Sequence, residues 1–173
     1  MNKNFIFVFV AIVVIGGIGL FLSRNSSSPS NVKHNSTVNP KSSEEGKSVE
    51  GYSGRVLAGS ASPYIEFNKS DYDKALSSGK VIFLDFYANW CPVCREEAPN
   101  LRAGFDALQT DKLVGFRVNY NDTETDEDEK KLAQEFGITY QHTKVILKNG
   151  KEINKSLESW DKETFLKEIN SAL

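Results

Sequence analysis

The chain has 173 residues and carries 21 lysines and arginines against 23 aspartates and glutamates, a formal net charge of -2. Because nucleic-acid-binding proteins present a strongly basic surface, this balance gives no indication of a nucleic-acid partner. The length suits one domain with appended segments, and apolar residues are distributed unevenly along the chain.

The N-terminal segment is strongly apolar. Residues 5–22 form an unbroken apolar run of about 18 residues between Lys3 and Arg24, close to the roughly 20 that a helix needs to cross a bilayer. The run is longer than the hydrophobic region of a signal peptide, and the residues that follow offer no good cleavage site. We therefore predict that residues 1–22 are a membrane anchor, with a cleaved signal peptide as the alternative. The flanking charges do not favour either orientation.

A polar segment follows the apolar one. Residues 23–62 are dominated by Ser, Asn, Gly, Lys and Glu and show almost no apolar periodicity, so they cannot bury enough surface to offset the entropy lost on ordering. We predict a disordered linker, which at about 40 residues would span roughly 35 Å root-mean-square. His34 lies in this linker and is expected to be a solvated side chain.

From residue 63 onward the pattern is that of an α/β domain. Residues 64–67 are a short strand candidate, and residues 70–78 are a helix that ends at Gly79. Residues 81–87 form a strand whose nearly continuous apolar character predicts burial on both faces, as at the centre of a sheet. A helix with a kink at Pro99 then continues to Leu108.

The second half of the domain continues this alternation. Residues 113–120 are predicted to form a strand, and the acidic run at 121–129 precedes a helix that reaches Phe136. Carboxylates at a helix N-terminus are explained by the helix dipole, and the spacing of an EF-hand is absent. The pair Asn149-Gly150 indicates a hairpin between strands 143–147 and 152–156, and an amphipathic helix at 162–173 closes the chain.

The most informative stretch joins the central strand to the helix after it. In this stretch Trp90 precedes Cys91 and Pro92 follows it, and Cys94 lies three positions after Cys91. In a helix that begins near Cys91, the unpaired backbone N–H groups and the positive end of the helix dipole favour a thiolate there. Pro92 suits the first helical position, because its missing N–H would have no helical partner. Cys91 is therefore the candidate nucleophile, and Cys94 is the thiol that resolves a mixed disulfide.

Two other uses of the cysteine pair compete with redox chemistry. Structural zinc usually needs a second pair of cysteines or histidines, and this chain offers only His34 and His142 besides. A structural disulfide that closes so short a loop would constrain the unfolded chain little. The residues therefore favour a redox-active disulfide and dithiol pair at Cys91 and Cys94.

The stretch LDFYANWCPVCREEAP resembles the active-site segment of the thioredoxin family. In that pattern an aspartate-bearing strand precedes WCxxC, and a proline follows five residues after the second cysteine. The matching residues are Asp85, Trp90, Cys91, Cys94 and Pro99. The run WCPVCREEAPNL is especially similar to membrane-tethered, extracytoplasmic thioredoxin-like reductases. The resemblance covers about residues 62–173 and implies an α/β, thioredoxin-like fold at 63–173, with a central mixed sheet flanked by helices.

The resemblance also implies roles for residues around the dithiol. Asp85 matches a buried aspartate that moves protons to and from the resolving cysteine, and a carboxylate in an apolar strand is costly unless it is partnered or neutralised. The alternative for Asp85 is a strand edge that faces solvent. Arg117 resembles a basic residue near this aspartate, with a surface role as the alternative. Trp90 is expected to cover the dithiol and to form part of the docking surface, although a core aromatic residue would give the same pattern.

One position departs from the family pattern. In the family a cis-proline precedes a threonine, in a loop that packs against the active cysteine and pairs with the substrate chain. Here His142 stands in that place, between Gln141 and Thr143. Because a cis bond before a non-proline residue costs about 2.5–4 kcal/mol, we expect the bond between Gln141 and His142 to be trans. His142 would then tune the Cys91 thiolate, serve as a structural loop residue, or bind a metal together with both cysteines.

These features together predict a membrane-anchored thiol–disulfide oxidoreductase that reduces disulfides of extracytoplasmic client proteins. The expected partners are these clients and a membrane thiol–disulfide electron donor, and no dissociable cofactor is needed. We expect a single-pass protein of the cell membrane with its catalytic domain outside the cytoplasm. The alternatives are a copper or zinc chaperone or sensor that uses Cys91, Cys94 and His142, and a module that binds clients without turnover. The reverse reaction, oxidation of client thiols, would use the same residues.

Overall fold

The computed structural model describes residue 49 and residues 51–173. The predicted membrane anchor at 1–22 and residues 23–48 and 50 of the predicted linker lie outside the described residues. In the described part of the chain, no helix has both the length and the apolar character that crossing a bilayer would require.

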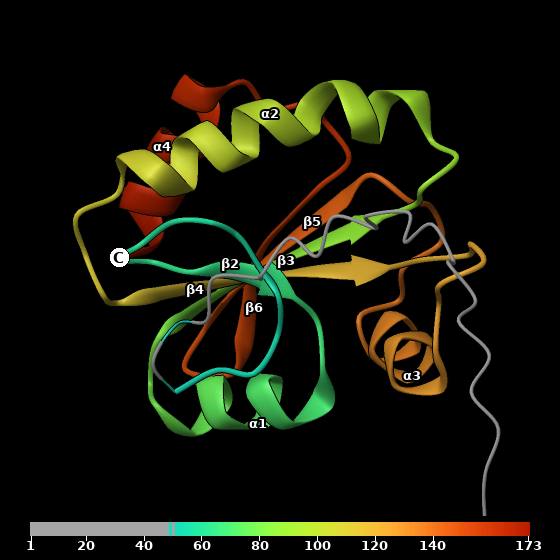
Figure 1. Ribbon diagram of the computed structural model, residues 1–173, viewed down its shortest axis with the longest axis horizontal. Coiled ribbons are helices and arrows are strands. Elements are labelled where there is room, and N and C mark those ends of the chain that lie inside the picture. The colour runs from blue at the N-terminus through green and yellow to red at the C-terminus, as the bar shows by residue number, and fades with distance from the viewer. Residues whose placement is uncertain (1–48, 50) are drawn as a thin grey trace, which may run out of the picture. The chain divides into compact units, whose positions relative to one another are not determined.

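A mixed sheet of six strands, in the order β1-β2-β4-β3-β5-β6, forms the middle of the domain (Figure 1). In chain order the strands are β1 (Val56–Ala58), β2 (Tyr64–Glu66), β3 (Val81–Tyr87), β4 (Leu113–Asn119), β5 (Thr143–Lys148) and β6 (Lys151–Ser156). The central strand β3 pairs in parallel with β4 and antiparallel with β5, and β2 extends the parallel part beyond β4. The hairpin strand β6 and the short strand β1 form the two edges.

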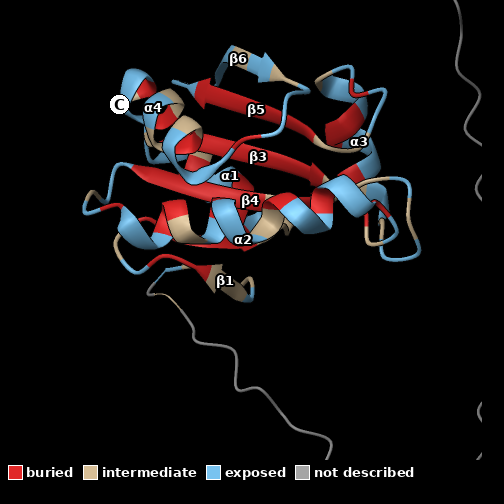
Figure 2. Cartoon of the chain, turned by 90° about the horizontal axis from the view of Figure 1, so that it is seen from above, coloured by how far each residue is buried: buried red, intermediate tan, exposed pale blue. Residues whose placement is uncertain are grey.

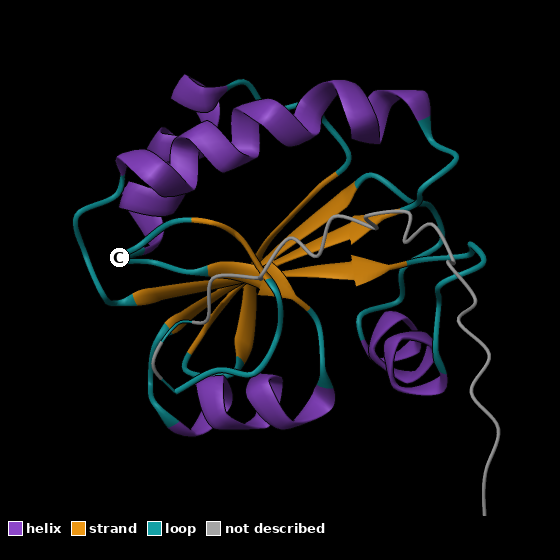
Figure 3. Ribbon diagram, in the orientation of Figure 1, coloured by secondary structure: helices purple, strands orange, loops and turns teal. Residues whose placement is uncertain are grey.

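Two helices cover each face of the sheet. In chain order they are α1 (Lys69–Ser77), α2 (Pro92–Ala107), α3 (Glu127–Glu135) and α4 (Lys162–Ala172). Helices α2 and α4 lie on one face, and α1 and α3 lie on the other (Figures 1 and 3). Burial on both sides leaves β3, β4 and β5 almost entirely inaccessible to solvent, which confirms the prediction for the central strand (Figure 2).

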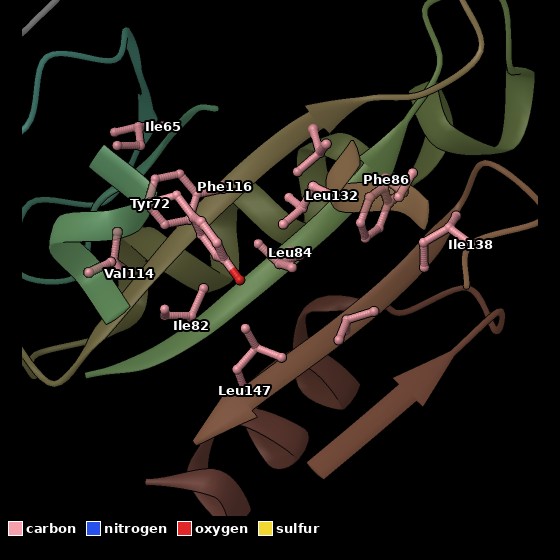
Figure 4. Close-up of a cluster of buried hydrophobic side chains, with 14 residues drawn as sticks. Ile65, Tyr72, Ile82, Leu84, Phe86, Val114, Phe116, Leu132, Ile138 and Leu147 are labelled. Carbon is pink, nitrogen blue, oxygen red and sulfur yellow. The ribbon is translucent and has the colours of Figure 1, made fainter. Parts of the chain in front are cut away.

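Alternate residues of β3 belong to two separate hydrophobic clusters, because successive side chains of a strand point to opposite faces. Leu84 and Phe86 pack with α1 and α3 in the cluster shown in Figure 4. Phe83 packs with Phe105 of α2 and Phe165 of α4 in the other cluster. Asp85 is in phase with Phe83, so its carboxyl group lies on the face that α2 and α4 cover.

Local residue chemistry explains where several elements begin and end. Asn68 caps α1 by accepting a hydrogen bond from the backbone N–H of Asp71 at 2.9 Å, and Asp161 caps α4 in the same way. Asn149 and Gly150 both have left-handed backbones, with φ of 53° and 70°, as the turn of a tight hairpin requires. The predicted hairpin between β5 and β6 is therefore confirmed.

One boundary of the predicted linker is wrong. The sequence predicts a linker at 23–62, but residues 56–58 form strand β1, antiparallel to β2. Ala58 is buried in the same hydrophobic cluster as Phe105. Three residues are too few to show the alternating pattern of a strand, so only the pairing with β2 reveals this element.

Candidate active site

The two cysteines lie at the start of α2, as predicted. Cys91 is the N-cap residue, and its sulfur accepts a hydrogen bond from the backbone N–H of Cys94 at 3.2 Å. Cys94 Sγ donates to Cys91 Sγ at 2.6 Å, and both residues are free thiols. Pro92 is the first residue of the helix, which confirms its predicted place. A sulfur that accepts two hydrogen bonds at a helix N-terminus has the surroundings of a nucleophile.

Cys94 is held in its protonated form. Burial, with the hydrogen bond to Cys91 and the nearby charge of Asp85, raises the pKa of Cys94 to about 12. A thiol with so high a pKa does not ionise unaided at neutral pH, so its attack on another sulfur requires a base. Cys91 is itself only 3% exposed, between Trp90 and Val93, which are 49% and 44% exposed. Trp90 and Val93 are therefore the exposed large apolar side chains nearest to Cys91 in the chain.

Asp85 is the buried carboxyl group whose charge acts on Cys94. It is 4% exposed on the central strand, which excludes the alternative of a strand edge facing solvent. The hydroxyl of Tyr64 donates a hydrogen bond to Asp85 Oδ2 at 2.6 Å. Burial raises the pKa of Asp85, and the negative charge of Glu97 acts in the same direction, whereas the hydrogen bond from Tyr64 opposes the rise.

Arg117 lies next to Asp85 in the sheet, but its guanidinium pairs with another carboxylate. The two residues are partners in the register between β3 and β4, as the resemblance implied. The Arg117 guanidinium forms an ion pair with Glu66 at 2.6 Å and lies over the ring of Tyr87, 5.0 Å from its centroid. The direct hydrogen-bond partner of Asp85 is therefore Tyr64 and not Arg117.

His142 has a left-handed backbone, with φ of 66°, and its peptide bond to Gln141 is trans as expected. Its backbone N–H donates to the carbonyl of Phe86 at the end of β3, at 2.6 Å. The half-buried Gln141 precedes it, and the buried Thr143 follows, with Oγ1 donating to the carbonyl of Tyr140. These contacts anchor the loop beside the strand that carries Asp85.

The ring of His142 faces an ion pair. Its Nδ1 lies 3.0 Å from Glu97 Oε2, within ion-pairing distance but without the alignment of a hydrogen bond. Its Nε2 lies 3.0 Å from Ser159 Oγ and 3.3 Å from Lys144 Nζ. Because Lys144 can only donate, the hydrogen-bond network assigns the ring proton to Nδ1.

The metal-binding alternative finds no support in this arrangement. Across residue 49 and residues 51–173, no three His, Cys, Asp or Glu side chains are arranged to hold a metal ion, and Cys91, Cys94 and His142 do not form such a group. The contacts of the His142 ring are instead with Glu97, Ser159 and Lys144.

Glu97 and Lys144 form a buried ion pair that our sequence analysis missed. Their charged atoms are 2.7 Å apart, and the side chains are 3% and 0% exposed. Glu97 also accepts the backbone N–H of Trp160, and Lys144 donates to the carbonyl of Glu158 at 2.6 Å. The pair thus joins α2, β5 and the loop between β6 and α4. A charge within the apolar run of β5 was the available signal, the same signal that identified Asp85 in β3.

Trp90 is a surface residue whose indole ring is fixed by one hydrogen bond. Its indole Nε1 donates to the carbonyl of Asn121 at 3.0 Å, and the neighbouring Asn89 N–H donates to Asp122 Oδ2 at 2.8 Å. The loop between β4 and α3 therefore fixes the residues that lead into Cys91. Half exposure of Trp90 excludes the alternative of a core aromatic residue, and its part in docking stays a prediction.

The fold and this site together define a dithiol redox protein, with its cysteines at a helix N-terminus after the central strand. Residues 63–171 match the family model described as Thioredoxin, which covers more than half of the chain. The protein belongs to the thioredoxin family. Thioredoxin-family relatives of this chain are thiol–disulfide oxidoreductases.

Several curated proteins are similar to this domain. The chloroplastic thioredoxin-like protein HCF164 of Oryza sativa subsp. japonica is 31% identical over 103 residues, which cover 59% of this chain and 37% of that protein. The thioredoxin-like protein YneN of Bacillus subtilis (strain 168) is 32% identical over 111 residues, 64% of this chain and 57% of that protein. Thioredoxin-2 of Pyricularia oryzae is 26% identical over 118 residues, 68% and 63% respectively. The chain thus spans less than two thirds of the length of each of these relatives.

Solved structures show the same fold. A mutant thioredoxin from Halobacterium salinarum NRC-1 superposes with a TM-score of 0.51 at 25% identity, over 66% of this chain and 94% of that chain. Trxlp from Edwardsiella tarda gives a TM-score of 0.50 at 27% identity, over 59% and 93%. The likeness covers nearly all of each of these two proteins, in agreement with a thioredoxin-like domain in the C-terminal part of this chain.

Proposed function

We propose that this protein is a membrane-anchored thiol–disulfide oxidoreductase that reduces disulfides of client proteins outside the cytoplasm. The observation that carries the redox activity is the Cys91 sulfur at the cap of α2, 2.6 Å from the sulfur of Cys94. Membership of the thioredoxin family supports the same activity. The apolar run at 5–22 supports the anchor. The polar residues after it, together with the resemblance to extracytoplasmic thioredoxin-like reductases, support the proposed location of the domain.

The first half of the reaction forms a mixed disulfide. The Cys91 thiolate, whose proton has gone to solvent, attacks one sulfur of a client disulfide. A bond forms between Cys91 and that sulfur, while the client disulfide breaks and its other sulfur leaves as a thiolate that takes up a proton.

The second half releases the client. Asp85 accepts the proton of Cys94, whose sulfur then attacks Cys91, so that the Cys91–Cys94 disulfide forms and the mixed disulfide breaks. The second client sulfur leaves as a thiolate and is protonated. The client gains two electrons and two protons in total, and a membrane dithiol partner then reduces the Cys91–Cys94 disulfide.

The surroundings of the dithiol agree with Cys91 as the nucleophile and Cys94 as the resolving thiol. Cys94 has a pKa of about 12, so it needs a base, and burial raises the pKa of Asp85 and thereby strengthens it as a proton acceptor. Trp90, Val93 and Tyr140 are 49%, 44% and 63% exposed and offer apolar surface for a client. The loop of Gln141, His142 and Thr143 is the proposed site for the client backbone.

Insulin reduction by the full 173-residue chain tests this proposal. We expect the wild-type protein to catalyse the reaction with dithiothreitol as reductant and Cys91→Ser to be inactive. Cys94→Ser should accumulate a mixed disulfide with the client, visible on a non-reducing gel, because the resolving thiol is absent. The control is Ser77→Ala, an exposed residue of α1 on the opposite face of the sheet.

Two outcomes would contradict the proposal. An inert wild-type protein would leave a client-binding module without turnover as the better description. Activity that persists in Cys91→Ser would show that the nucleophile lies elsewhere.

A further inference from the structure

Tyr64 reaches Asp85 across an intervening strand. Tyr64 belongs to β2 and Asp85 to β3, and β4 lies between these two strands in the sheet. Tyr64 is 1% exposed and Asp85 is 4% exposed, so the 2.6 Å hydrogen bond between them is shielded from water. A shielded hydrogen bond to a carboxylate is among the stronger ones in proteins.

A glycine in β4 opens the path for the tyrosine. Gly115 is the register partner of Tyr64 on one side and of Phe83 on the other. A Cβ at Gly115 would lie 2.3 Å from Phe105 Cζ and 3.0 Å from Tyr64 Cδ2. Any other residue at position 115 would therefore displace the two rings that lie over β4.

Aromatic packing fixes the direction of the tyrosine ring. Tyr64 stacks on Phe105 of α2 with ring centroids 4.8 Å apart and an interplanar angle of 5°, and it meets Phe83 edge-on. Because the ring is held on both sides, its hydroxyl is directed at Asp85 before any client arrives. Such preorganisation is what a proton-transfer site requires.

We propose that Tyr64 is a positioning residue of the redox site, whose hydroxyl holds the Asp85 carboxylate in the orientation that accepts the proton of Cys94. Tyr64 occupies Oδ2, and within the described residues Oδ1 has no hydrogen-bond partner and stays available for the proton. This inference rests on the proposed function, since it assigns a role within the second half of that reaction.

The charged groups around Asp85 explain why its hydrogen-bond donor is the neutral hydroxyl of Tyr64 and not a cation. The groups that face Asp85 come from every adjoining element: Tyr64 on β2, Arg117 on β4, Lys144 on β5, Cys94 and Glu97 on α2, and His142 in the loop before β5. Arg117 is paired with Glu66, and Lys144 is paired with Glu97. A direct ion pair would make Asp85 a weak base, whereas a hydroxyl orients the carboxylate and leaves it able to take a proton.

The variant Tyr64→Phe tests this role because it removes one oxygen and keeps the stacked ring. An aromatic disulfide serves as the substrate, since it releases two coloured thiols in succession when it meets the reduced full-length chain. The first release reports attack by Cys91, and the second reports attack by Cys94. We expect the second release at pH 7 to slow about tenfold, the effect of one charge-assisted hydrogen bond, while the first release is unchanged.

The pH profile provides a readout that a purely structural role would not move. Loss of the hydroxyl donor raises the pKa of Asp85, so the acidic limb of the profile for the second release should move to higher pH. The matched control is Tyr72→Phe, a buried tyrosine in the cluster on the opposite face of the sheet (Figure 4). It should keep both rates and the wild-type profile.

A double-mutant cycle shows whether Tyr64 acts through Asp85. In Asp85→Asn, the further change Tyr64→Phe should slow the second release no more. An unchanged second release in Tyr64→Phe alone, or an equal further loss in the Asp85→Asn background, would overturn the inference and leave the proposed function standing. A wild-type chain that releases neither thiol would instead contradict the proposed function.

A second measurement covers the case in which Tyr64→Phe fails to fold, as judged by near-ultraviolet circular dichroism. The hydroxyl proton of Tyr64 should then be sought by NMR in the wild-type protein and in Asp85→Asn. We expect a slowly exchanging resonance whose position changes when Asp85 is replaced. A hydroxyl proton that exchanges freely with water would overturn the inference.

Discussion

Two buried carboxyl groups lie near the dithiol, and their surroundings drive their pKa values in opposite directions. Burial raises the pKa of Asp85. Burial would also raise the pKa of Glu97, but contacts with His142, Lys144 and the backbone N–H of Trp160 outweigh it and lower the pKa. Carboxyl groups separated in this way take different roles. Asp85 is suited to carry a proton, and Glu97 is suited to be a fixed anion that holds neighbouring segments together.

If Glu97 is a fixed buried anion, the free energy of unfolding should depend on its cation. Lys144→Met leaves the Glu97 carboxylate buried without its cation, so the free energy of unfolding should fall by about 3 kcal/mol in urea denaturation. The control Lys151→Met, at an exposed residue of β6, should change it by less than about 0.5 kcal/mol. Adding Glu97→Gln to Lys144→Met removes the unpaired charge and should recover part of the loss. A double variant as unstable as Lys144→Met would contradict this account.

At the scale of elements, the cap of α3 is linked to the approach to Cys91. Glu129 accepts the backbone N–H of Asp126 at 2.9 Å and that of Asn119 at 2.7 Å, so one carboxylate fastens both ends of the loop between β4 and α3. The same loop holds the indole of Trp90 through the carbonyl of Asn121. The acidic run at 121–129 therefore does more than interact favourably with the helix dipole, because it also supports the active site from a distance.

This cap predicts a pH dependence of stability. Burial raises the pKa of Glu129 from 4.5 to about 7. The folded protein then binds this proton more tightly than the unfolded chain does, so the group favours folding at low pH, and its contribution is lost as the pH rises through about 7. The unfolding free energy of the wild type, relative to that of Glu129→Gln, should therefore fall between pH 4.5 and about 7.

Urea denaturation at several pH values measures this difference. Glu124→Gln, at an exposed residue of the same loop, is the matched control and should track the wild type across the range. If the difference between Glu129→Gln and the wild type stays constant with pH, Glu129 does not titrate in this window.

At the scale of the whole molecule, the sheet order decides which residues meet. Parallel pairing of β2 with β4 and of β4 with β3 brings Tyr64 over Gly115 towards Asp85, and antiparallel pairing of β5 with β3 sets Lys144 opposite Asp85. The active site thus draws side chains from across the sheet and from α2. The proposed anchor adds one further property, attachment of this domain to a membrane.

The anchor makes a prediction that fractionation of cells can check. The full chain should sediment with membranes and be released by detergent but not by carbonate at high pH, because an apolar helix of about 18 residues is held by the bilayer core. Deletion of residues 1–22 should move the protein to the soluble fraction. Carbonate extraction of the full chain would contradict an integral anchor, and labelling of its thiols on intact cells would report the side on which the domain lies.

The amino-acid pattern alone predicts the order of elements from residue 64 onward, the dithiol at the start of α2 and the hairpin at Asn149-Gly150. Each of these depends on signals between near neighbours: apolar periodicity, a capping residue, a turn dipeptide. It also singled out Asp85, because a charge inside an apolar strand is conspicuous without any knowledge of its partner.

The partners of those residues become visible only in the folded domain. Tyr64 and Asp85 are 21 positions apart, and Arg117 and Glu66 are 51 apart, so no local pattern relates them. The buried pair of Glu97 and Lys144 depends in the same way on α2 packing against β5. Strand β1 forms because its backbone pairs with β2. Contacts of this kind follow from strand order and packing, which short-range sequence signals do not encode.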